Sequence, residues 1–179
     1  MMRTLFAALA ALIVTTTPAR ADVAETSAGA FLLRAESEVA APPEQVWRNL
    51  SQIGRWWSDS HTYSGDARRM RVDMRAGGCW CERWSGGEIE HGRVALIMTR
   101  EGVRTLRFYA ALGPLQELGA QGVLTFTIAP HASGARVTMT YRVSGDPDLG
   151  LNAMAPLVDG VLMEQFGRLI RLSATGSPG

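Results

Sequence analysis

Thiol, imidazole and carboxyl groups are concentrated between His61 and His91. Within this stretch Cys79 and Cys81 are separated by a single tryptophan, and Glu82 follows them directly. Thiolate and imidazole are the ligands that zinc and copper prefer. The Cys-x-x-Cys and His-x-x-x-His spacings of common metal motifs are absent, so we expect no metal site. Cys79, Cys81 and His91 are the residues that would form one.

The spacing of the two cysteines restricts how they can pair. Residues two apart in a strand are separated by about 6.6 Å, which is near the upper limit for a disulfide. A Cys79–Cys81 disulfide therefore needs a bend, which the preceding Gly77 and Gly78 allow. Two free thiols, or a bridge to another molecule, are the alternatives. We place His91 on the same outer face as the cysteines.

Glu82 and His61 are the candidate catalytic residues. Alternation along residues 79–84 places Glu82 on one face with Trp80 and Trp84. If that face is internal, burial among apolar groups raises the pKa of the carboxyl, as general acid–base chemistry requires. The alternative is an ordinary ion pair between Glu82 and a nearby arginine.

Aromatic residues indicate where a ligand would bind. All five tryptophans lie between Trp47 and Trp84. Indole rings suit a pocket for a flat or apolar ligand, although they also fill ordinary cores. The predicted ligand-binding residues are Trp56, Trp57, His61, Tyr63, Trp80, Glu82, Trp84, Phe108, Phe126 and Asp159.

The periodicity of the chain defines the elements that must position these residues. A strand is expected over 31–39, followed by two short helices, the first starting at Pro42–Glu44. Alternating patterns predict strands over 69–75, 79–84, 89–99, 104–111, 121–129 and 135–144, and a helical pattern covers 155–172. This order predicts an α+β fold. A curved antiparallel sheet of about six to seven strands wraps a long C-terminal helix and leaves a cavity between them.

The N-terminal residues have the features of an export signal. A short basic start, ten apolar residues and the sequence Ala19-Arg20-Ala21 predict a signal peptide over residues 1–21, cleaved after Ala21. We therefore expect a periplasmic or secreted bacterial protein, with no transmembrane segment in the mature chain. Residues 22–30 are a predicted flexible lead, 31–173 a single domain and 174–179 a loose tail. The 18 basic and 17 acidic residues argue against nucleic-acid binding.

Several short motifs resemble a known superfamily. The segment 39–47, Trp56-Trp57, Gly77-Gly78 and the segments 92–94 and 134–138 resemble the helix-grip fold of the START-like (SRPBCC) superfamily. Within it they are most similar to the polyketide cyclase/dehydrase-like branch, the homologues of the heat-shock ATPase activator. A more distinctive cluster resembles an exported subgroup and comprises residues 57–61, 78–83, 90–91, 112–115 and 158–161.

The resemblance implies a fold that hosts carriers, cyclases, dehydratases and co-chaperones. We predict an exported binding protein that holds a small hydrophobic or amphipathic ligand between the sheet and the last helix, without a cofactor. The alternatives are a cyclase- or dehydratase-type enzyme in which Glu82 or His61 moves a proton, and a metal or thiol site at Cys79, Cys81 and His91. Neither the ligand nor the oligomeric state follows from the sequence.

Overall fold

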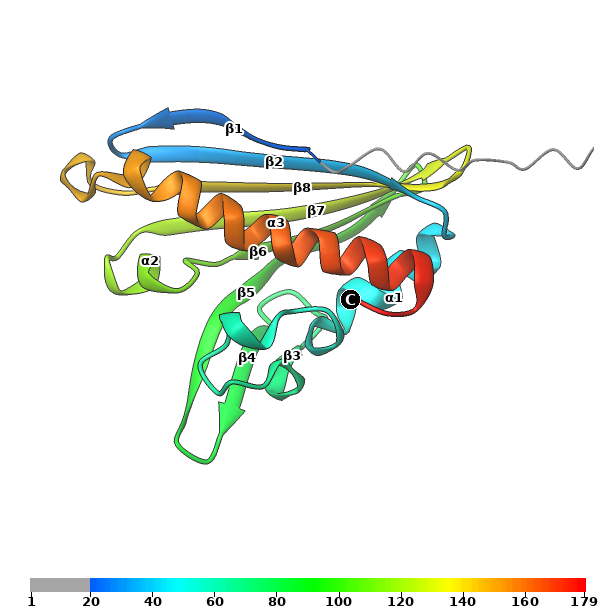
Figure 1. Cartoon of the computed structure of the whole chain (residues 1–179), viewed down its shortest axis with the longest axis horizontal. Coiled ribbons are helices and arrows are strands. Elements are labelled where there is room, and N and C mark those ends of the chain that lie inside the picture. The colour runs from blue at the N-terminus through cyan, green and yellow to red at the C-terminus, as the bar shows by residue number, and fades with distance from the viewer. Residues whose placement is uncertain (1–19) are drawn as a thin grey trace, which may run out of the picture.

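The computed structural model describes residues 20–179, with side chains from Val23 onward. The chain forms one antiparallel sheet, one long helix and several short helices (Figure 1). The strands are β1 (Arg20–Ser27), β2 (Ala30–Val39), β3 (Met70–Val72), β4 (Cys79–Trp84), β5 (Gly87–Arg100), β6 (Val103–Tyr109), β7 (Gln121–His131) and β8 (Gly134–Ser144). The α-helices are α1 (Pro43–Ser51), α2 (Pro114–Glu117) and α3 (Leu151–Thr175), and the 3-10 helices are Ile53–Arg55, Asp59–His61, Ala67–Arg69 and Pro147–Leu149.

The eight strands follow the order β1-β2-β8-β7-β6-β5-β4-β3. Helix α3 runs along one face of this sheet, and the β4–β5 hairpin bends away from the remaining strands (Figure 1). The buried side chains of β7 and β8 alternate with more exposed ones, as expected for a sheet with one covered face. The predicted α+β fold, with a sheet wrapped on the C-terminal helix, is therefore confirmed.

Local sequence explains the short helix that follows β2. Helix α1 begins with a proline, whose missing N–H is not needed in the first turn, and Glu44 lies near its positive end. Val46 and Leu50 are buried and pack in the main core. Gln45 also donates a hydrogen bond from Nε2 to the carbonyl oxygen of Ser173, at 2.9 Å, which connects α1 to the end of α3.

The structure differs from the sequence prediction at both ends of the domain. Residues 22–30 were expected to form a flexible lead, but β1 pairs with β2 from Arg20↔Glu36 to Ser27↔Ala30 and adds a strand to the predicted number. The tail was expected to be loose, but Arg168 and Arg171 donate hydrogen bonds to the carbonyl oxygens of Gly179 and Pro178. In both segments, pairing outside the local sequence imposes order on small, polar residues.

The remaining boundaries shift by a few residues. The strand expected over 69–75 is only three residues long, and α3 begins at Leu151 rather than near 155. Within the described residues, no helix has the length and apolar character needed to cross a bilayer. The predicted signal peptide over residues 1–21 lies almost entirely outside the described residues.

Candidate functional site

A cavity of about 410 Å³ lies beneath the first half of α3. Four parts of the chain enclose it: α3, the connection from β6 to α2, the loop around the Asp59–His61 helix, and β5. The lining residues are mostly apolar and comprise Trp57, His61, Thr62, Tyr63, His91, Leu112, Gly113, Pro114, Leu115, Met154, Leu157, Val158, Val161 and Leu162. A cavity of this size and lining suits a small apolar molecule.

Exposure of the lining residues distinguishes the mouth of the cavity from its floor. Leu157 is 74% exposed and Tyr63 is 53% exposed, so both lie at the rim. Leu115 and Leu162 are buried, and His91 is only 6% exposed. A ligand would therefore enter past Tyr63 and Leu157 and reach His91 at depth.

Tyr141 of β8 fixes the wall formed by residues 112–115. Its hydroxyl donates to the carbonyl oxygen of Ala110 at 2.8 Å and accepts a hydrogen bond from the backbone N–H of Leu112 at 3.1 Å. Burial raises the pKa of Tyr141, so the phenol stays protonated. Gly122 permits this approach, because a Cβ atom there would lie 2.0 Å from the Ala110 oxygen.

The loop that carries His61 is anchored to α3. The backbone N–H of Ser58 donates to Gln165 Oε1 at 2.7 Å, and His61 Nε2 lies 3.0 Å from Glu164 Oε2. A hydrogen bond from the Ser58 side chain lowers the pKa of Glu164, and His61 lowers it further despite partial desolvation. Trp57 Nε1 also donates to the carbonyl oxygen of His61, at 2.8 Å.

Behind the floor of the cavity, Glu82 and His91 form a buried pair. Glu82 is completely buried, and its Oε2 lies 2.9 Å from His91 Nε2. Two backbone N–H groups also donate to the carboxylate, from Tyr63 at 3.1 Å and from Ser64 at 2.5 Å. The hydroxyl of Ser64 is a further hydrogen-bond partner, so four groups converge on one carboxylate in the interior.

These donors decide the charge of Glu82. Desolvation raises the pKa of the carboxyl, but the hydrogen bonds from Ser64, Tyr63 and His91 together outweigh it and lower the pKa. The sequence led us to expect a raised pKa and an acid–base role for Glu82. The expected rise in pKa was wrong, because the hydroxyl and backbone N–H of Ser64 and the backbone N–H of Tyr63 replace the water that burial removes. Glu82 is an ionised residue that positions His91.

The state of His91 follows from the charge of Glu82. Desolvation lowers the pKa of the imidazole, and the nearby carboxylate only partly offsets this effect, so the ring is neutral. An ionised carboxylate can only accept, so the Nε2 atom of His91 carries the proton and donates to it. The Nδ1 atom of His91 then carries a lone pair.

A β-bulge explains why His91 points inward. Trp80 pairs with Gly92 and Cys81 pairs with Glu90, so His91 is an extra residue in β5. Simple alternation places it on the outer face with the cysteines, as we expected, but the bulge rotates it into the interior. Gly92 is needed beside it, since a Cβ atom there would lie 2.7 Å from Ala110 Cβ.

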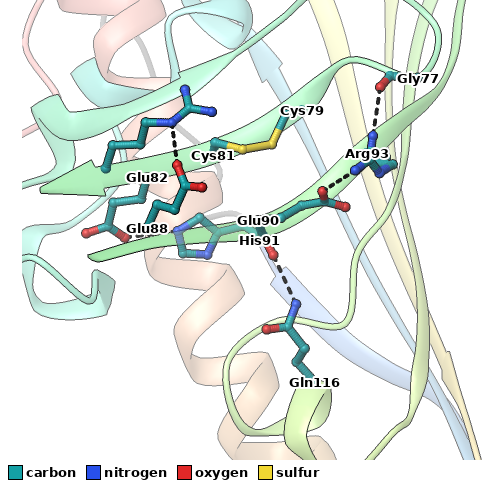
Figure 2. The surroundings of a disulfide bond; sticks show 10 residues. Gly77, Cys79, Cys81, Glu82, Glu88, Glu90, His91, Arg93 and Gln116 are labelled. Carbon is teal, nitrogen blue, oxygen red and sulfur yellow. Dashed lines mark hydrogen bonds and ion pairs between the residues drawn. A yellow bond between two sulfur atoms is a disulfide. The ribbon is translucent and has the colours of Figure 1, made fainter. Parts of the chain in front are cut away.

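The cysteines form a disulfide along β4 (Figure 2). By strand alternation they lie on the opposite side of β4 from the buried Trp80. Figure 2 also shows Gln116 reaching the bulge from α2, where its Nε2 donates to the carbonyl oxygen of Glu90 at 2.9 Å. No cluster of three or more metal-ligating side chains occurs among the side chains that the structure describes, those of residues 23–179. The cysteines and His91 therefore do not converge on one site.

The structure separates the ten predicted ligand-binding residues into groups. Trp57, His61 and Tyr63 line the cavity. The others do not line it: Trp56, Trp80, Phe108 and Phe126 are buried in the core, Glu82 lies behind His91, Trp84 is at the tip of the β4–β5 hairpin, and Asp159 is half-buried on α3. The walls are thus mostly aliphatic, with one indole ring.

The prediction based on aromatic residues did not identify most of the residues that line the cavity. Leu112–Leu115, His91 as a lining residue, and the α3 residues Met154, Leu157, Val158, Val161 and Leu162 were not predicted as ligand contacts. A signal was nevertheless present. The segments 57–61, 90–91, 112–115 and 158–161, which resemble one exported subgroup, all contribute to this cavity.

Solved structures with a similar fold include the Aha1 dimer from Colwellia psychrerythraea, at a TM-score of 0.55 and 12% identity over 81% of this chain and 97% of that chain. A norcoclaurine synthase from Thalictrum, solved with a transition-state analogue, has a TM-score of 0.52 and 14% identity, over 80% of this chain and 94% of that chain. A hypothetical protein from Helicobacter pylori has a TM-score of 0.53 and 10% identity, over 82% of this chain and 89% of that chain. No family model and no curated protein matches the sequence. At these low identities the likenesses show a shared fold alone, so the activity has to be argued from the site.

Proposed function

We propose that the protein binds a small hydrophobic or amphipathic molecule in the cavity beneath α3. The observation that carries this proposal is the cavity of about 410 Å³ with its mostly apolar lining. The free energy of the system falls when a ligand of matching shape displaces water from the apolar surface of a cavity. The exposed Leu157 and Tyr63 at the rim offer the same advantage to a ligand that extends outward.

The proposal includes export to the periplasm or secretion. Its support is the predicted signal peptide over residues 1–21. Expression of the full chain in a Gram-negative host should give periplasmic protein whose intact mass begins at Asp22. Recovery of the uncleaved chain from the cytosol would contradict export without affecting the binding proposal.

A cavity-filling substitution tests ligand binding. The probe is 1-anilinonaphthalene-8-sulfonate, which becomes fluorescent in apolar surroundings. Val158→Trp places an indole ring in the cavity and should weaken probe binding at least tenfold. Ala153→Trp is the matched control, because Ala153 lies on the exposed side of the same helix and should leave binding unchanged. Equal binding by wild type and Val158→Trp would contradict the proposal.

A second candidate function is an enzyme that acts on a ligand in this cavity. The observation that favours it is that His91 lines the cavity while its Nε2 is held by Glu82. His91 Nδ1 would take a proton from the carbon next to a ligand carbonyl, the electron pair would move to the carbonyl oxygen, and Glu82 would stabilise the imidazolium. The test is α-proton exchange of 2-tetralone in D₂O, followed by NMR. The wild-type protein should accelerate this exchange, and His91→Gln should not. If the wild-type protein does not accelerate it, the proposed enzymatic function is contradicted.

A further inference from the structure

We infer that His91 Nδ1 is the polar anchor of the cavity, and that the ligand is a neutral apolar molecule with a hydroxyl or N–H donor at its inner end. This inference rests on the proposed ligand-binding function. It adds the chemical class of the ligand and the atom that selects it.

The first step is the direction of the Glu82–His91 hydrogen bond. The other partners of the carboxylate are the backbone N–H groups of Tyr63 and Ser64 and the hydroxyl of Ser64. They hold Glu82 in its ionised, acceptor-only form. The proton between the two residues therefore belongs to Nε2 of His91, and the tautomer with a lone pair on Nδ1 is fixed.

The second step is that the Nδ1 lone pair has no partner among residues 23–179. The hydrogen bond to Glu82 is the one that the His91 ring makes with them. Two aromatic rings lie against it: Trp80 at 5.5 Å and Tyr63 at 5.9 Å between centroids. An acceptor at the apolar floor of a cavity is costly to leave unpaired. A ligand that brings a donor to this position satisfies it.

The third step concerns charge. The pair of neutral His91 and ionised Glu82 has a net negative charge, and no arginine lines the cavity. A carboxylate or phosphate at the inner end of a ligand would add a second, uncompensated negative charge in a desolvated place. The structure therefore favours a neutral donor at the floor.

The remaining polar groups lie nearer the mouth. Thr62 Oγ1 donates to the carbonyl oxygen of Asp59, and His61 Nε2 is occupied by Glu164. The side chain of His61 is 32% exposed, and Tyr63 is 53% exposed. A ligand is therefore oriented with its donor at His91, its apolar body under Val158 and Leu162, and its other end toward solvent.

The test compares two ligands of nearly the same shape. 1-Naphthol carries an O–H donor, whereas 1-methoxynaphthalene carries none, and binding of each is measured by calorimetry. Wild type should bind 1-naphthol about tenfold more tightly, the discrimination that one buried hydrogen bond typically supplies. His91→Gln keeps an N–H donor for Glu82 but lacks the ring acceptor, so the preference should fall to about twofold or less.

Two controls make the outcome decisive. His131→Gln changes a histidine at the end of β7 that does not line the cavity and should leave the preference intact, whereas loss of the preference in His131→Gln alone would overturn the inference. His91→Phe, an apolar ring variant, should bind both compounds equally if it folds. Equal binding of the two compounds by wild type would overturn the inference and leave the proposed function standing. Binding of neither compound, together with no 1-anilinonaphthalene-8-sulfonate binding, would overturn both.

Discussion

Cys79 and Cys81 draw β4 together on the outer face of the sheet, opposite the point where β5 contains its extra residue. Their Cα atoms are 5.4 Å apart, compared with about 6.6 Å in an extended strand. At this point β4 is contracted and β5 contains one additional residue, and the pairing register shifts between Trp80 and Cys81. The two strands remain paired on both sides of the shift. The disulfide thus supports the bulge that turns His91 toward the cavity.

Removal of the disulfide should therefore affect both stability and ligand choice. We expect Cys79→Ser/Cys81→Ser to lose roughly 1–2 kcal/mol of unfolding free energy, as estimated for closure of a very short loop. Its preference for 1-naphthol over 1-methoxynaphthalene should also decrease. The measurements are urea unfolding and calorimetry, with and without a phosphine reductant. The reductant should lower the stability and the 1-naphthol preference of the wild-type protein and should leave those of the double variant unchanged. If reduction and the double substitution both leave the preference unchanged, the proposed link between the disulfide and the position of His91 is contradicted.

The hydroxyl of Tyr141 should be needed for the cavity wall. Tyr141→Phe leaves the part-buried Leu112 N–H and the buried Ala110 oxygen without this partner, which costs about 1–2 kcal/mol of unfolding free energy. Because the wall formed by residues 112–115 loosens, 1-anilinonaphthalene-8-sulfonate should also bind more weakly. Tyr109→Phe is the matched control, since Tyr109 is 66% exposed on β6. Equal urea midpoints for the two variants would contradict this role.

Stability should fall in acid through His91 and Glu82. The pKa of His91 in the folded protein lies below its ordinary value of 6.5. As the pH falls below 6.5, the histidine of the unfolded chain therefore takes up a proton before the histidine of the folded chain does, which favours unfolding. Stability attributable to His91 is therefore complete above pH 6.5 and is lost as the pH falls toward the folded pKa. Glu82, with a pKa below 4.5, contributes in the same direction at lower pH. Its carboxylate and the phenol of Tyr63 are the titratable groups that contact His91.

The measurement is the urea midpoint at pH 7.5, 6.5 and 5.5 for wild type and His91→Gln. Wild type should lose stability over this range, and the variant should lose less. His131→Gln, in the β7–β8 hairpin beside Glu38, is the control and should follow wild type. Parallel profiles for wild type and His91→Gln would show that His91 titrates normally.

The sequence predicted the framework of the fold better than the site. Alternation over residues 121–129 and 135–144 located β7 and β8, and the helical pattern after residue 155 located α3, because each covers one face of a core. The position of His91 was not predictable, since a bulge depends on pairing between strands and reverses the face assigned by alternation. The charge of Glu82 was missed for a related reason. Two of its donors are the backbone N–H groups of Tyr63 and Ser64, and backbone groups leave no signal in residue types.

Gly160 offers a stabilising change close to the cavity. It lies in the interior of α3 between the lining residues Val158 and Val161, and a Cβ atom there would meet no atom within 4 Å. Gly160→Ala should therefore raise the unfolding free energy by about 0.5–1 kcal/mol, because alanine loses less backbone entropy in a helix. This gain corresponds to an increase in Tm of roughly 1–4 °C for a chain of this size. Calorimetry measures the shift, and Gly122→Ala is the opposite control, since its Cβ would collide with the Ala110 oxygen and lower Tm. A lower Tm for Gly160→Ala would mean that α3 needs the flexibility of glycine at this position.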